Sequence, residues 1–308
     1  MEFFRQTNFD FIGIRKYTYI FSGLVTLLSL FWIIFHGFNY GIDFTGGTSL
    51  ELKFEKPIAI ADVRSIVSST GFSDSEIKQI GAKEDNSYLV RVGLKEEGVQ
   101  VADVVQSQFS KDLPDNKYEV LAVTQIGPKI GGELRRGAIM SILVALLGLL
   151  IYIGWRFDSK FAVGAVIATF HDVIFVLGIF TFLGLEMSLT VLAALLTIVG
   201  YSINDTIVVY DRIRENLKIH RRDDLPTIMN LSMNQTLSRT LLTGVSTLVV
   251  LIILFFMGGE VIHDFSFTLF IGTVIGTYSS IYVASALVLD WNNWLEAKKH
   301  KKPATRTA

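Results

Sequence analysis

The sequence contains no cysteine, which excludes disulfide bonds and zinc sites built on thiolates. Charge is also scarce: Asp, Glu, Lys and Arg make up 19% of the 308 residues, below the roughly 25% of a soluble domain. The net charge of −1 provides no basic field for nucleic acid. Half of the residues are apolar, which excludes a disordered chain. Together these properties argue against a soluble globular protein.

The apolar residues are gathered in six stretches, each about as long as a membrane-spanning helix. Among 29 Asp and Glu and 28 Lys and Arg residues, only Asp172 and Asp205 lie within these stretches. Buried helices of a soluble protein would need a far larger protein around them. We therefore predict a polytopic α-helical membrane protein with six transmembrane helices, at 17–35, 137–155, 161–185, 188–210, 241–259 and 265–289.

The basic residues near the ends of these stretches indicate the orientation. An even number of spans places both termini on one side, and Lys and Arg are concentrated on that side. The short opposite loops, near Glu186 and at 260–264, contain neither. The positive-inside rule then predicts that both termini are cytoplasmic. The predicted parts are a cytoplasmic N-terminus at 1–16, transmembrane helix 1 at 17–35, a periplasmic domain at 41–136, transmembrane helices 2–6 at 137–289 and a cytoplasmic tail at 290–308.

The segment 41–136 carries enough charge to fold in water, and its strand and helix patterns alternate. The residues at 48–55 alternate between apolar and polar, which is typical of a half-buried strand, whereas 58–70 has apolar residues at helical spacing. The predicted order is β-α-β-β-α-β, an α+β ferredoxin-like domain between helices 1 and 2. Its further elements are expected at 76–82, 87–94, 99–113 and 118–126. No catalytic or metal-ligand cluster is present, so we predict a binding or docking module without a cofactor.

Ionisable groups within a membrane are costly and are functional candidates. Asp205, flanked by Asn204, is predicted in the inner third of the bilayer, and Arg239 opens the fifth span at a similar depth. An Asp that gains and loses an Arg partner can bind and release a proton, although a static pair would only join two helices. His171 and Asp172 lie near the midplane and are expected to face different neighbours. They form either a proton relay or a structural polar pair.

Two other segments suggest local structure. Gly127-Pro128 and the pair Gly131-Gly132 are typical of a hinge between the outer domain and the second span. The segment 216–238 has apolar residues spaced among polar ones, which favours an amphipathic helix on the inner membrane surface.

Taken together, these features resemble the SecF members of the SecD/SecF family, within the RND superfamily. Five segments carry the resemblance and are spread over most of the chain: GIDFTGGTSLEL (41–52), GPKIGGELRRGA (127–138), HDV (171–173), VGYSINDTIVVYDRIREN (199–216) and NQTLSRT (234–240). The resemblance implies an RND-type half of six spans. It also implies that Asp205 and Arg239 correspond to the Asp and Arg of the family's proton pathway.

The resemblance further implies a non-enzymatic subunit of the bacterial secretion translocon in the inner membrane. With SecD as heterodimer partner, it would use the proton gradient to drive late preprotein translocation and release on the periplasmic side. The other implied partners are the SecYEG channel, SecA, YajC, unfolded preprotein and membrane lipids. Two alternatives stay open at this point: an RND-type exporter of small amphiphiles or lipids, and an intramembrane aspartyl protease using Asp172 and Asp205.

Overall fold

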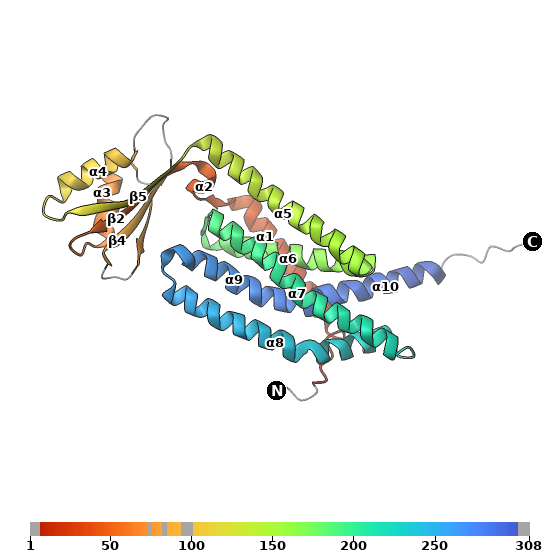
Figure 1. The fold of residues 1–308 in the computed structure, drawn as a ribbon. Helices are drawn as coiled ribbons and strands as arrows, with labels where there is room; N and C mark the ends of the chain where they lie inside the picture. The colour runs from red at the N-terminus through yellow and green to blue at the C-terminus, as the bar shows by residue number, and fades with distance from the viewer. Residues whose placement is uncertain (1–6, 73–74, 82–84, 94–100, 301–308) are drawn as a thin grey trace, which may run out of the picture.

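The computed structural model describes residues 7–72, 75–81, 85–93 and 101–300. Within these residues, six helices are long and apolar enough to cross a membrane, and a small α+β domain lies at one end of their bundle (Figure 1). This confirms the predicted fold class. Several positions named in the sequence predictions lie outside the described residues: 1–6, 82, 94, 99 and 301–308.

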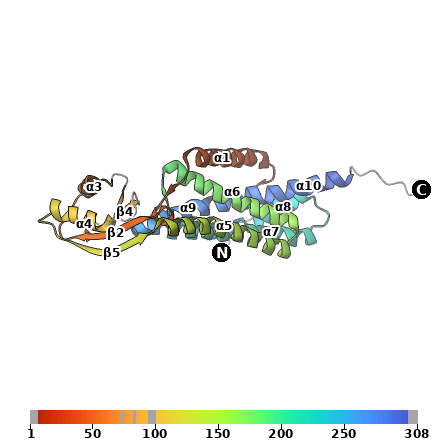
Figure 2. The same cartoon turned by 90° about the horizontal axis from the view of Figure 1, so that it is seen from above.

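The membrane bundle has a buried centre and an apolar exterior. Helices α6 and α7 and the last span, which runs from α9 into α10, are the most buried, whereas α1, α5 and α8 expose long apolar faces suited to lipid. Helix α1 lies along one side of the bundle, in contact with α6 (Figure 2). The helices are α1 Arg15–His36, α5 Pro128–Arg156, α6 Ser159–Leu183, α7 Leu189–Ile219, α8 Leu225–Met257, α9 Glu260–Ser279, the π-helix η2 Ser280–Ala284, and α10 Ser285–His300.

The predicted surface helix over 216–238 is wrong. Residues 225–238 form the first turns of α8, which is a continuous helix through the fifth apolar stretch. Met229 and Met233 are buried in the core of the bundle. The segment before α1 also covers this part of α8, because the backbone of Phe9 exchanges two hydrogen bonds of 2.9 Å with the side chain of Asn234. Packing against protein thus replaces the expected packing against lipid.

The outer domain follows the split βαβ arrangement. Its elements are β2 Gly47–Phe54, α3 Ile60–Ser69, β3 Glu76–Ile80, β4 Ser87–Gly93, α4 Val101–Asp112 and β5 Tyr118–Ile126. The sheet order is β3-β4-β2-β5, and every neighbouring pair is antiparallel. Helices α3 and α4 cover one face of the sheet (Figure 1).

Alternation along β2 explains why this sheet is covered on one side. Leu50, Leu52 and Phe54 point into a core that also contains Val63 of α3 and Phe109 of α4, while the intervening side chains face away. The buried apolar clusters of the outer domain and of the bundle are separate among the described residues. The domain therefore has its own hydrophobic core.

The chain enters the outer domain through a short connection that is fastened to the bundle. Strand β1 (Asn39–Tyr40) pairs in parallel with β6 (Glu186–Met187) in the turn between α6 and α7. The single-turn helix α2 (Ile42–Thr45) follows and buries Phe44 in an apolar cluster of the bundle. The chain leaves the outer domain through α5. This helix begins at Pro128, well before the apolar stretch at 137, because the charged residues that precede this stretch are also helical.

Candidate functional site

The structure places Asp205 and Arg239 on neighbouring helices, α7 and α8. Asp205 is only 3% exposed, and its Oδ2 is a buried atom without a hydrogen-bond partner. Arg239 is exposed on the surface of this chain, and it forms no ion pair with Asp205 within 4.0 Å. The hydroxyl of Thr240, next to Arg239, is also buried and unpartnered. Such unmatched buried polar atoms are uncommon in proteins, and each calls for an explanation.

A cavity of about 500 Å³ lies between α7 and α8, on the side of Arg239 and toward the ends of these helices that lie away from the outer domain. Asn204 and Arg239 are among its lining residues. Polar contacts link the two helices at the cavity wall. Arg212 of α7 donates hydrogen bonds of 2.6 Å to Gln235 of α8 and to Glu215 of its own helix. The cavity beside Arg239 is therefore lined mainly by polar side chains. The rest of the contact between α7 and α8, nearer the outer domain, is mainly apolar.

His171 and Asp172 contact each other, and their other contacts differ, because the ring of His171 stacks on Phe175 whereas Asp172 bonds to α7 and α9. Their role, as a proton relay or as a structural polar pair, stays a prediction. Nδ1 of His171 lies 3.0 Å from Oδ1 of Asp172, and both side chains are buried. Oδ2 of Asp172 accepts hydrogen bonds from the hydroxyls of Ser202 on α7, at 2.6 Å, and Ser279 on α9, at 2.7 Å. The short Asp side chain can reach both helices because it is fully buried between them. This cluster joins α6, α7 and α9.

Close helix packing surrounds the Asp172 cluster. A Cβ on Gly272 would collide with the side chain of Ile198, and one on Gly276 would lie 3.1 Å from Cβ of Ser202. The two glycines therefore let α9 approach α7 closely, as small residues do in membrane helices. Immediately after Ser279 the helix widens into the π-helix η2, a distortion that is common at functional sites.

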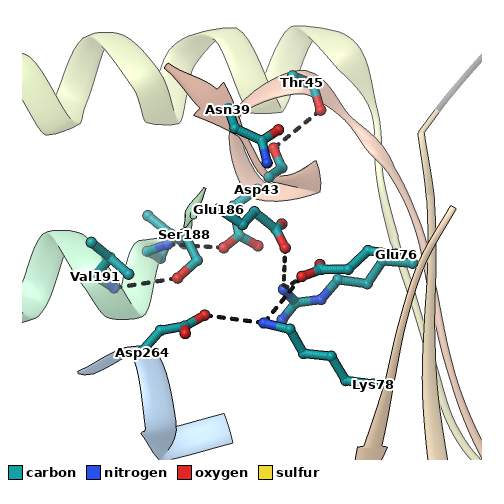
Figure 3. Close-up of polar contacts among 12 residues, drawn as sticks. Asn39, Asp43, Thr45, Glu76, Lys78, Glu186, Ser188, Val191 and Asp264 are labelled. Atoms are coloured by element: carbon teal, nitrogen blue, oxygen red, sulfur yellow. Dashed lines mark hydrogen bonds and ion pairs between the residues drawn. The ribbon is translucent and has the colours of Figure 1, made fainter. Parts of the chain in front are cut away.

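A second group of polar side chains lies where the outer domain meets the bundle (Figure 3). Lys78 of β3 contacts Asp264 of α9 at 3.0 Å, and Arg91 of β4 contacts Glu186 of β6 at 3.1 Å. Glu76 lies between the two cations and contacts both. Burial disfavours the charged form of Lys78, but the Glu76 and Asp264 carboxylates outweigh this effect and raise the pKa of Lys78 above its usual value. Lys78 is therefore cationic at neutral pH.

The glycine-rich loop 41–47 has a role that the sequence did not reveal. Oδ2 of Asp43 accepts a hydrogen bond of 2.9 Å from the backbone N–H of Leu189, at the start of α7. A carboxylate at this position satisfies a free N–H group and suits the positive end of the helix dipole. Gly46 has φ +83° and packs against Pro128, so the turn that presents Asp43 depends on glycine.

The two glycines of the predicted hinge occupy different environments. Both lie in the first turns of α5, and Gly131 is buried. A Cβ on Gly131 would lie 2.9 Å from the backbone N of Gly46 and 3.0 Å from the backbone C of Phe44, whereas a Cβ on Gly132 would meet nothing within 4 Å. Gly131 thus allows α2 to contact α5. The hinge role of Gly131 and Gly132 stays a prediction.

We expect Gly131→Ala to destabilise the protein by about 1–3 kcal/mol, because backbone atoms of α2 would have to move. Gly132→Ala is the matched control and should be neutral or slightly stabilising, since Ala favours a helix and has free space here. The measurement is the unfolding temperature of the full chain in mild detergent. Equal unfolding temperatures for the two variants would contradict the close packing of α2 on α5.

The fold and these polar clusters define the class of protein: a membrane transport subunit built as one half of an RND-type transporter. Two family descriptions match the sequence. "Protein export membrane protein SecD/SecF, C-terminal" matches residues 105–294, and "SecD/SecF GG Motif" matches residues 31–58. The second match includes the glycine-rich loop that presents Asp43.

Curated relatives agree with these matches. The SecF protein translocase subunit of Desulfurispirillum indicum is 44% identical over 288 residues, covering 91% of each chain. The SecF subunit of Magnetococcus marinus is 44% identical and covers 99% of this chain and 98% of the relative. The chain belongs to the SecF family of protein translocase subunits. This membership supports a role in protein translocation, which is a transport role and not an enzymatic one.

Fused relatives identify the partner. The protein translocase subunit SecDF of Thermus thermophilus is 42% identical over 96% of this chain, which spans 40% of the relative. A crystal structure of SecDF from the same organism matches with a TM-score of 0.80 and 42% identity over 93% of this chain, which covers 39% of that structure. The fusion supports partnership with SecD.

Proposed function

We propose that this chain, together with SecD, uses the proton gradient to drive late preprotein translocation and release on the periplasmic side. The observation that carries the proposal is the pair on α7 and α8: Asp205 is buried with an unpartnered oxygen, and Arg239 lies on the next helix without a direct ion pair. A carboxylate held in this way can take up a proton when the cation moves off and lose it when the cation approaches. Asp172, held by the hydroxyls of Ser202 and Ser279 and by its contact with His171, has no comparable freedom.

The test of this proposal compares membrane vesicles that contain SecD and this chain with vesicles that lack this chain. Preprotein export is started by the ATP-driven motor and is followed with and without a proton gradient. We expect the gradient to speed late translocation only when this chain is present, and an ionophore to abolish the difference. A gradient response of equal size without this chain would refute the proposal.

We further propose that the chain lies in the bacterial inner membrane with the outer domain in the periplasm. The supporting observation is the basic side of the bundle, where Arg156, Arg212 and Lys218 lie at the ends of α5 and α7 opposite the outer domain. By family resemblance, the complex with SecD would work beside the SecYEG channel with SecA and YajC. Co-purification of the complex from membranes in mild detergent tests these partners.

Single-cysteine labelling tests the orientation, and it is clean because the chain has no cysteine of its own. Glu119→Cys, on exposed β5, should react with a membrane-impermeant thiol reagent added outside spheroplasts. Lys218→Cys, exposed at the inner end of α7, should react only after the membrane is permeabilised. The reverse pattern would invert the proposed topology.

A further inference from the structure

The outer domain meets the bundle at two places that differ in chemistry. On one side, α2 and the start of α5 form a contact that we call the clamp. Here Phe44 is buried in the bundle, Asp43 is bonded to the N-terminus of α7, and Gly131 lies against the backbone of Gly46. Backbone hydrogen bonds between β1 and β6 reinforce it. The clamp therefore combines a buried aromatic side chain, hydrogen bonds to the backbone and close packing of backbone atoms.

On the other side, the contact consists of ion pairs. We call Glu76, Lys78, Arg91, Glu186 and Asp264 the latch. Lys78 and Arg91, on β3 and β4, are each about one quarter exposed, and they bridge to α9 and to the turn between α6 and α7 (Figure 3). A cavity of about 460 Å³ lies among these side chains, so the two surfaces are not packed closely here. No cluster of buried apolar residues in the described chain joins β3 or β4 to the bundle.

The strength of such contacts decides which side separates first. A partly exposed ion pair changes an equilibrium by a factor of only about 1.4 to 5. Nε of Arg91 is buried without a partner, so the closed latch leaves one donor of its own unsatisfied. Separating the clamp would instead expose Phe44 and break the backbone pairing of β1 with β6 and the hydrogen bond of Asp43. The latch is thus the weaker of the two contacts.

We propose that the latch is a reversible lock: its ion pairs hold the outer domain against the bundle, and their separation lets the domain tilt about the clamp. Asp264 lies in the first turns of α9, and Ser279 at the other end of the same helix donates to buried Asp172. At 1.5 Å per residue, these ends are about 22 Å apart. Helix α9 thereby connects the latch directly with the buried cluster.

Pulsed electron paramagnetic resonance on the full chain in lipid nanodiscs tests the lock. Spin labels are attached at Lys53→Cys, on the far end of β2, and at Met257→Cys, the last residue of α8; both positions are exposed. In this background, Lys78→Glu with Arg91→Glu should raise the population of longer distances several-fold, because every pair becomes repulsive. Lys111→Glu, a charge reversal on exposed α4, is the matched control and should leave the distances unchanged.

Exchanging the charges of one ion pair distinguishes an open latch from a general loss of folding. Lys78→Glu combined with Asp264→Lys reverses one cross-domain pair and should restore the short distances, relative to Lys78→Glu alone. The proposal fails if the double reversal gives the wild-type distances, if the Lys111→Glu control lengthens them equally, or if the exchange restores nothing. The measurement involves no proton gradient, so its failure would leave the proposed function standing.

Discussion

Vesicles that carry Asp205→Asn should translocate preprotein under ATP but show no response to a proton gradient. A proton that crosses 100 mV yields about 2.3 kcal/mol, enough to bias a two-state change more than tenfold. Using that energy requires a group that is protonated in one state and ionised in the other. Asn has nearly the same shape as Asp but cannot exchange a proton in this way, so coupling should be lost while insertion and SecD binding persist.

Substitutions of Arg239 should show whether the gradient response depends on its charge alone or also on the geometry of its hydrogen-bond donors. Arg239→Met removes the cation that favours the ionised form of Asp205 and should be as severe as Asp205→Asn. Arg239→Lys keeps the charge but loses the planar fork of five donors, so we expect partial loss. The measurement is the ratio of translocation rates with and without the gradient.

A matched control shares the helix of Asp205. Asp211 lies further along α7, is partly exposed, and pairs with Arg156 at 3.1 Å. Asp211→Asn should keep the full gradient response, because this carboxylate faces solvent and is already paired. A wild-type response from Asp205→Asn would refute the assignment and direct attention to the Asp172 cluster or to the partner subunit.

The six spans and the outer sheet could be predicted because their signals are local. Exclusion of charge marks a span whatever its neighbours are, and Leu50, Leu52 and Phe54 alternate within a single strand. The helix at 225–238 shows where this reasoning ends. Its apolar stripe is compatible with lipid or with protein. Contacts between residues far apart in the sequence decide between them: Asn234 is hydrogen-bonded to the segment before α1, and Met233 is buried in the bundle.

The candidate sites could be predicted only where one residue is informative by itself. Asp172 and Asp205 stand out as acids in apolar spans. The contact of Asp43 with Leu189 and that of Lys78 with Asp264 join residues that no spacing rule relates. Such pairs depend on how the two domains are placed, which a single sequence does not contain. The proton-pathway role of Asp205 and Arg239 stays a prediction.

Stability measurements should separate the two intramembrane acids. Asp172 accepts hydrogen bonds from the buried hydroxyls of Ser202 and Ser279 and contacts the buried ring of His171, and an unsatisfied buried donor costs about 1–3 kcal/mol. Asp172→Leu should therefore lower the unfolding temperature in mild detergent by roughly 10 °C. Asp172→Asn keeps one acceptor oxygen and should be milder. Ser202→Ala and Ser279→Ala each remove a single hydrogen bond and should have small effects.

Asp205→Asn, in contrast to Asp172→Leu, should not lower the unfolding temperature. Its carboxylate is buried with one unpartnered oxygen, and a neutral amide is less costly to bury than a charge. We expect an unfolding temperature equal to or above that of the wild type. This result would agree with a functional role for Asp205, whereas a large loss for Asp172→Leu would agree with a structural role for Asp172 in joining α6, α7 and α9. The assignment is reversed if Asp172→Leu unfolds at the wild-type temperature yet loses the gradient response, because Asp172 would then be a proton relay and not a structural acid.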